Sequence, residues 1–174
     1  MWFMRPNVDR LLRQQDLPGL LKALGHSDSM VRESAVHALI ELGRSSAAFA
    51  LGIASRFIGQ ELTENDSDLQ TAAVDILVGI GTDVISPLLT SLTIPAVDAV
   101  LRDRITEVLV EIGRREPGQT LLEIESRASR RPDPTMLSHV IRALKSVREG
   151  LTDVEQMKAT DECLARLDIL WRSA

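Results

Sequence analysis

The amino-acid sequence predicts an all-α fold, a solenoid of about four helical hairpins with a capping helix at each end. A segment that begins with Asp recurs four times without an internal gap, at Asp28, Asp66, Asp98 and Asp133. In each copy, apolar residues lie three, seven, eleven and fourteen positions after the Asp, which is the spacing of one face of an α-helix. Aromatic residues make up only 3% of the chain, so the core must be aliphatic, which suits stacked helices.

The four copies predict helices over residues 28–43, 66–81, 98–113 and 133–148. The Asp is a favoured N-cap, and Pro134 occupies the preferred first helical position of the last copy. Gly43, Gly81 and Gly113 stand where a left-handed C-terminal cap is expected, and Arg148 replaces the glycine in the fourth copy. The predicted core positions are Val31, Ala35, Leu39, Leu42, Leu69, Ala73, Leu77, Ile80, Leu101, Ile105, Leu109, Ile112, Met136, Val140, Leu144 and Val147.

A second apolar stretch precedes each of these helices, over residues 17–24, 48–62, 84–92 and 120–128. Each pair forms a hairpin that needs a stacked neighbour to bury its faces. The predicted repeats are therefore residues 17–43, 48–81, 83–113 and 118–148, within one domain covering residues 1–174. Residues 8–15 form the N-terminal cap, tied to Trp2 and Phe3.

The C-terminal capping helix is predicted over residues 152–172. Thr152 and Glu155 have the spacing of a capping box at its start. The residues expected to turn inward are Val154, Met157, Leu164, Leu167 and Leu170.

On these residues the chain resembles the HEAT-repeat superfamily, in the short form typified by the phycobilin-lyase type repeat. The first copy matches the family pattern best, at Asp28, Val31, Arg32, Ala35, Ala38, Leu39 and Gly43. Arg102 keeps the family arginine, whereas Gln70 and Leu137 replace it. The resemblance extends to Arg148 and implies a right-handed α–α superhelix in which the repeated helices line the concave side. It specifies a fold shared by many functions.

Composition narrows the class of protein. The single Cys163 excludes an intramolecular disulfide and a cysteine-based zinc cluster, which favours the cytoplasm. No apolar run approaches the roughly 18 residues of a membrane span, so we expect no membrane partner. The net charge of −5 argues against a general nucleic-acid binder.

The sequence contains no recognisable catalytic or metal-binding constellation. His26, His37 and His139 fall on different helix faces in separate repeats, so we expect rim histidines and no metal. HEAT-like hydroxylases that hold two irons supply His-Glu pairs, and this chain has no His-Glu dipeptide. Cys163 lies in mid-helix, where a buried structural thiol is common. We therefore predict a protein that is not an enzyme and has no cofactor.

Positions five, nine and thirteen after each Asp face away from the predicted core. They predict an acidic concave surface that binds a protein or peptide with a basic segment. Its residues are Glu33, His37, Glu41, Asp75, Asp103, Glu107 and Glu111, whereas Thr71, Gly79, Ser138, Arg142 and Ser146 occupy the remaining equivalent positions. The alternative for this stripe is a solvated helix face without a partner.

Charge is unevenly distributed along the chain. Residues 1–113 carry 15 acidic and 9 basic side chains, whereas residues 114–148 carry 4 and 8. The basic segment contains Arg114, Arg115, Arg127, Arg130 and Arg131. Two other functions stay open: an accessory subunit of an enzyme complex, by resemblance to phycobilin-lyase subunits, and nucleic-acid binding through residues 114–148.

Overall fold

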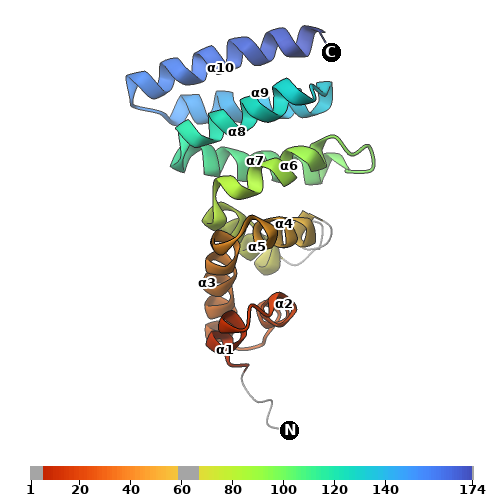
Figure 1. The fold of residues 1–174 in the computed structure, drawn as a ribbon, viewed down its shortest axis with the longest axis vertical. Helices are drawn as coiled ribbons and strands as arrows, with labels where there is room; N and C mark the ends of the chain where they lie inside the picture. The colour runs from red at the N-terminus through yellow and green to blue at the C-terminus, as the bar shows by residue number, and fades with distance from the viewer. Residues whose placement is uncertain (1–5, 59–66, 174) are drawn as a thin grey trace. The chain divides into compact units, whose positions relative to one another are not determined.

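A computed structural model of the chain describes residues 6–58 and 67–173 (Figure 1). The described residues form helices joined by short turns, with no strand among them, so the all-α prediction is confirmed. The chain divides into two compact units, Met1–Asp83 and Val84–Ala174. Each unit is described by itself below.

The first unit is built around one long helix. It contains α1 (Val8–Arg13), α2 (Leu17–Leu24), α3 (Ser29–Ser45), α4 (Ala47–Arg56) and α5 (Ser67–Ile80). The central helix α3 packs against the other four. Its apolar stripe, including Ala35 and Leu39, is fully buried.

The second unit is a two-layered stack. It contains α6 (Ile85–Leu92), α7 (Ala99–Arg115), α8 (Pro117–Arg130), α9 (Pro134–Gly150) and α10 (Val154–Ser173), and the short turn η2 (Thr82–Val84) leads into it. Helix α6 packs on α8, and α7 packs on α9. Helix α10 packs on both α8 and α9, so it covers one end of the stack (Figure 1).

The predicted N-caps are confirmed wherever the structure describes them. Carboxylate oxygens of Asp28, Asp98 and Asp133 accept hydrogen bonds from backbone amides of the first helical turn at 3.0, 2.8 and 2.9 Å. Asp66 lies outside the described residues. At these three positions the Asp therefore starts its helix through its own side chain.

The predicted start of α10 is wrong by one residue. Asp153, not Thr152, caps the helix, because its carboxylate accepts from the amide of Gln156 at 2.8 Å. Val154 is consequently the first helical residue, and its side chain is 77% exposed instead of turned inward. Leu167, by contrast, is buried as predicted.

Only one of the three predicted glycine caps is a cap. Gly81 follows α5 with φ 91°, a backbone conformation that favours glycine. Helices α3 and α7 instead continue through Gly43 and Gly113, to Ser45 and Arg115. Those two predictions are wrong, because glycine serves helix packing at both positions.

Gly43 in α3 and Gly79 in α5 let these two helices approach closely. A Cβ atom on Gly43 would lie 2.5 Å from Cδ1 of Ile80, and one on Gly79 would lie 2.5 Å from Cδ1 of Ile40. The two contacts interlock α3 with α5. Gly79 is therefore buried, although the sequence placed it on the outward face.

The predicted core positions of the four repeated helices are buried, except for Leu69, which is half-buried. Leu39, Leu77 and Leu109 are all at most 1% exposed. The aliphatic core expected from the composition is confirmed in both units.

Arg32 and Arg102, which occupy equivalent positions of two copies of the repeat, each bind the turn that precedes their helix. A guanidinium nitrogen of Arg32 donates to the carbonyl of His26 at 2.9 Å and to that of Ser27 at 3.1 Å. Arg102 likewise donates to the carbonyl of Ile94 at 3.2 Å. Each arginine therefore ties an inner helix to the turn that precedes it.

No single helix in the described part of the chain is long and apolar enough to cross a membrane. The consecutive segments Ser67–Ile80 and Thr82–Leu92 reach that length and apolar content only when they are counted together.

Candidate functional site

The acidic positions of the first unit lie on α3 and α5. Glu33, His37 and Glu41 follow one another at four-residue intervals along α3, and all three are exposed. Asp75 on α5 is exposed as well. No ion-pair partner is found for these carboxylates among residues 6–58 and 67–173.

The packing of α3 on α5 brings these residues to neighbouring helices that run in the same direction. Arg32 shares a cavity of about 250 Å³ with Asp68 and Ala72, near the start of both helices. Ile40 meets Gly79 near the end of both helices. The exposed side chains therefore form one surface, which we call the α3/α5 face (Glu33, His37, Glu41 and Asp75).

The acidic positions of the second unit are each paired with an arginine. Asp103 pairs with Arg142 at 2.5 Å, Glu107 with Arg104 at 3.2 Å and Glu111 with Arg114 at 2.7 Å. Because each carboxylate faces a guanidinium, the charge of these three positions is offset locally. The predicted acidic surface is thus unpaired in the first unit and neutralised in the second.

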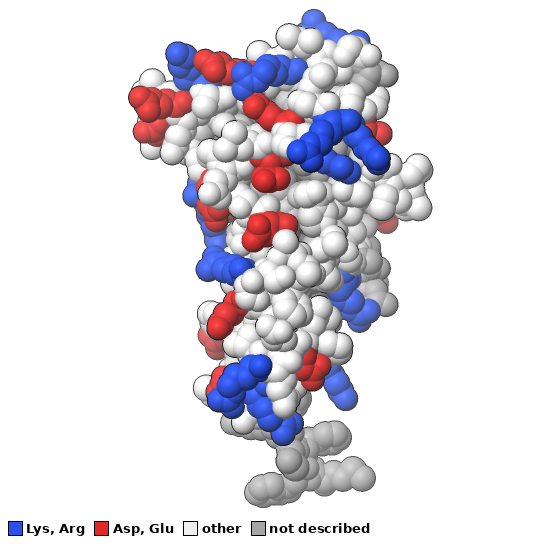
Figure 2. Space-filling model, viewed as in Figure 1, with Lys and Arg blue, Asp and Glu red and all other residues white. Residues whose placement is uncertain are grey.

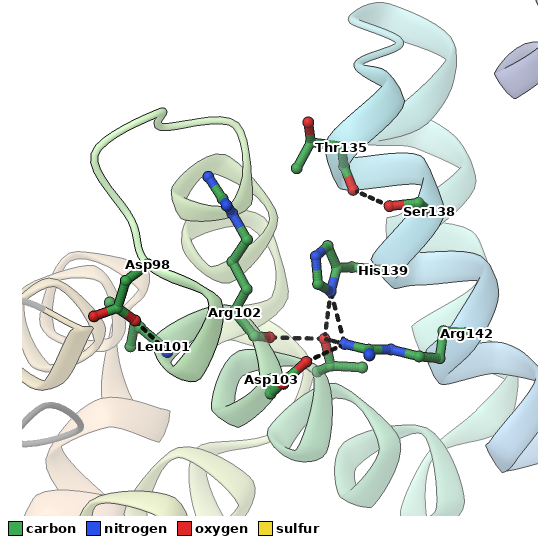
Figure 3. A network of polar contacts seen from close by, with 9 residues as sticks. Asp98, Leu101, Arg102, Asp103, Thr135, Ser138, His139 and Arg142 are labelled. Atoms are coloured by element: carbon green, nitrogen blue, oxygen red, sulfur yellow. Dashed lines mark hydrogen bonds and ion pairs between the residues drawn. The ribbon is translucent and has the colours of Figure 1, made fainter.

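The pair Asp103–Arg142 belongs to a network that links α7 to α9 (Figure 3). Nη2 of Arg142 also approaches Nδ1 of His139 at 2.9 Å and Oγ1 of Thr106 at 3.3 Å. Thr106 Oγ1 lies 3.1 Å from the same Nδ1 and donates to the carbonyl of Arg102 at 2.8 Å. Four side chains from two helices therefore converge on one point.

The network determines which nitrogen of His139 carries a proton. A guanidinium has donors only, so Nδ1 of His139 must accept from Arg142. The ring is then neutral, with its proton on Nε2. Burial, and after it the positive charge of Arg142, lowers the pKa of His139 below 6.5, although Asp103 opposes this.

The sequence places Asp103 and Arg142 on the outward face but does not indicate that they pair. His139 was expected at the rim, and it is half-buried against α7. Thr106 was not selected at all. The ion pair could have been found from the sequence. When parallel helices stack, the fifth residue after one repeat's Asp lies beside the ninth residue after the next repeat's Asp, and here those residues are Asp103 and Arg142, which carry opposite charge.

Cys163 has no arrangement suited to nucleophilic chemistry. Its side chain is fully buried, as predicted for a structural thiol. Burial, together with a hydrogen bond to Glu125, raises its pKa to about 12. Since the thiolate is the reactive form, this thiol is unreactive at neutral pH.

The described residues also line surface depressions in the second unit. One of about 380 Å³ runs along α9 and is lined by Ser138, Ile141, Arg142, Lys145, Ser146 and Glu149. In the described part of the chain, no three His, Cys, Asp or Glu side chains are grouped to hold a metal ion.

Comparison with known proteins adds no relative: no family model matches the chain, and neither does any curated protein.

Proposed function

We propose that this chain is a non-catalytic interaction module that binds a protein or peptide with a basic segment through the α3/α5 face. The proposal includes a HEAT-like arrangement of the hairpins, for which the recurring Asp-capped helices and the turn-fastening arginines Arg32 and Arg102 are the support. Repeat proteins of this kind present extended, rigid binding surfaces.

The observation that carries the proposal is the difference in charge pairing between the units. Glu33, Glu41 and Asp75 project into solvent from adjacent helices without an arginine partner in the described residues. Unpaired carboxylates on a rigid support attract and orient a cationic segment. The equivalent carboxylates of the second unit are already engaged, so we assign recognition to the first unit.

The test compares charge reversals at matched exposed sites. The variant Glu41→Lys/Asp75→Lys alters the α3/α5 face, whereas Glu123→Lys/Glu149→Lys makes the same change of charge at exposed positions of the second unit. A fluorescent Lys- and Arg-rich peptide serves as the probe, and its affinity is measured by anisotropy at low and at physiological salt. Helical content and melting temperature should stay close to wild type in both, because exposed substitutions usually change stability by less than about 0.5 kcal/mol.

We expect the reversal on the α3/α5 face to weaken peptide binding by about tenfold at low salt, which corresponds to about 1.4 kcal/mol. The effect should shrink at physiological salt because exposed charges are screened. Equal weakening by both variants would show that only net charge matters, and the proposal would then be wrong. Affinity purification from the source cells with the same two variants would identify the natural partner.

A further inference from the structure

One edge of the second unit brings together two chain turns and the end of a helix. The α6–α7 loop (residues 93–98), the α8–α9 turn (residues 131–133) and the C-terminal end of α10 lie together at the right of that unit in Figure 1. Their proximity follows from the packing of α6 on α8, α7 on α9 and α10 on α9. We call this region the arginine edge, after Arg102, Arg127, Arg130 and Arg131.

Exposed apolar side chains concentrate at the arginine edge. Ile94 and Val100 flank the α6–α7 loop and are 44% and 67% exposed. Ile169 and Trp171 on the last turns of α10 are 68% and 46% exposed. Among the described residues of this unit, the other large exposed apolar side chains are Leu122 and Val154 alone. Four of the six large exposed apolar side chains among the described residues of this unit therefore belong to this edge, and exposed apolar groups gathered in one region mark an interaction surface.

The arginines at this edge lack carboxylate partners in the described part of the chain. Arg102 donates to a backbone carbonyl, and Arg127 donates to the hydroxyl of Thr90 at 3.0 Å. Arg130 and Arg131 are exposed. Elsewhere in the unit arginines do pair with carboxylates, as Arg148 does with Asp161.

The acidic groups of the edge are themselves engaged. The carboxylates of Asp98 and Asp133 accept from backbone amides of the helices that they cap, and Asp168 pairs with Arg172 at 2.7 Å. Figure 2 shows Lys and Arg side chains gathered between the end of α10 and the projecting α6–α7 loop. The edge is therefore both cationic and apolar.

We infer that the arginine edge binds the surface of an anionic lipid bilayer. Ile94 and Val100 flank a projecting loop, and Ile169 and Trp171 lie at the end of a helix. A protein partner would need a matching hollow for them, whereas a fluid headgroup layer adapts to them. Tryptophan favours the membrane–water interface, and guanidinium groups form bidentate hydrogen bonds with phosphate. Two signals, apolar insertion and charge, are what stable peripheral binding needs. This inference concerns a different unit, and a partner of opposite charge, from the proposed function. It departs from the sequence-based expectation of no membrane partner, which rests only on the lack of a spanning segment.

The experiment measures association of the full chain with vesicles. Co-sedimentation is compared for phosphatidylcholine vesicles with and without phosphatidylserine. Because the sequence has two tryptophans, the Trp2→Phe variant makes Trp171 the only fluorophore, and its emission should shift to the blue when vesicles with phosphatidylserine are added. Arg130→Gln/Arg131→Gln should lower partitioning by about ten- to thirtyfold, since each arginine near the surface contributes about 1 kcal/mol. Arg10→Gln/Arg13→Gln in the first unit is the matched control.

The inference stands if binding requires phosphatidylserine, shifts the Trp171 emission and is weakened by the Arg130/Arg131 change but not by the control. Conservative glutamine substitutions at exposed sites keep the fold, and circular dichroism verifies it. Absence of vesicle binding at low salt overturns the inference, as does binding that both variants weaken equally. Binding to polyglutamate without binding to vesicles also overturns it, because the edge would then recognise an acidic protein segment.

Discussion

The pair α3/α5 of the first unit and the pair α7/α9 of the second unit follow the same repeat pattern but are joined differently. Two glycines join α3 to α5, each receiving an isoleucine from the facing helix. Between α7 and α9, one such contact, Gly113 against Val147, is combined with the polar network of Asp103, Thr106 and Arg142. One repeat pattern therefore supports an apolar and a mixed helix interface.

The comparison extends to the outward faces. In the first unit the joint between helices is apolar, and the carboxylates remain unpaired. In the second unit, arginines pair with the carboxylates at the equivalent positions of α7 and offset their charge. Arg142 comes from the facing helix α9, and Arg104 and Arg114 come from α7 itself. The repeat thus determines the core, and the surface at equivalent positions is free to diverge in charge.

The largest expected effects concern the shared core column. Leu77→Ala in the first unit and Leu109→Ala in the second should each lower the free energy of unfolding by about 2 to 5 kcal/mol, because both side chains are buried and truncation leaves a cavity. Urea unfolding followed by circular dichroism measures the loss. A change below about 1 kcal/mol for Leu77→Ala would contradict the register of the repeat.

The same two variants test whether the chain is the single domain predicted from its sequence. Trp171, in a Trp2→Phe background, reports on the second unit alone. If the units unfold together, Leu77→Ala shifts the Trp171 transition as much as Leu109→Ala does. If they unfold separately, only Leu109→Ala shifts it.

Much of the fold could be predicted because helix periodicity and capping are local properties. The N-cap at Asp28 and the buried position of Leu39 are both predicted correctly, because each depends only on residues within one or two helical turns. Gly43 and Gly113 were misread because a glycine near a helix end fits two explanations. Only the partner helix, which brings Ile80 or Val147 against the glycine, distinguishes close packing from a cap.

The next effect isolates the glycine contacts. Gly43→Ala places a methyl group against the buried Ile80 and should destabilise the chain by about 1 to 3 kcal/mol, less the roughly 1 kcal/mol that alanine gains in a helix. Ile80→Val removes Cδ1, the nearer of the two Ile80 atoms that would clash, and keeps the γ carbons, so the double variant should recover part of the loss. Thermal melts of the four chains measure the coupling, and strict additivity would show that Gly43 does not serve packing.

The candidate site was less predictable than the fold. Exposure of Glu33 and Asp75 follows from helix periodicity. The partner of Asp103 lies on the neighbouring helix α9, and a single repeat does not contain that information. The partner of Glu111 is Arg114, three residues later in the same helix, so that pair could have been found from the sequence. Thr106 and His139 became interpretable only when α7 and α9 were seen side by side (Figure 3).

A smaller effect is expected from the ion pair between α7 and α9. Asp103 and Arg142 are both more than half exposed, so their coupling in a double-mutant cycle should be about 0.2 to 1 kcal/mol. The cycle uses Asp103→Asn and Arg142→Gln, with stabilities from urea unfolding. High salt should reduce the coupling. A coupling well above this range would mean that the network with Thr106 and His139 acts as one unit.

The smallest expected effect is a dependence of stability on pH that arises from His139. Its folded pKa lies below 6.5, because burial and Arg142 disfavour the charged ring while Asp103 only partly compensates and Arg102 adds to the repulsion. The unfolded chain therefore binds the proton first as pH falls, so the stabilisation from the neutral ring is complete above about pH 6.5 and is lost as pH decreases toward the folded pKa.

His139→Asn keeps an acceptor near the position of Nδ1 but does not titrate. Urea unfolding of both chains between about pH 5 and pH 8 should show the wild type losing stability relative to His139→Asn only in the acidic half of that range. Arg142→Gln should make the wild-type loss smaller, because it removes one of the charges that depress the pKa. Parallel curves for wild type and His139→Asn would show that Nδ1 is not held as an acceptor between α7 and α9.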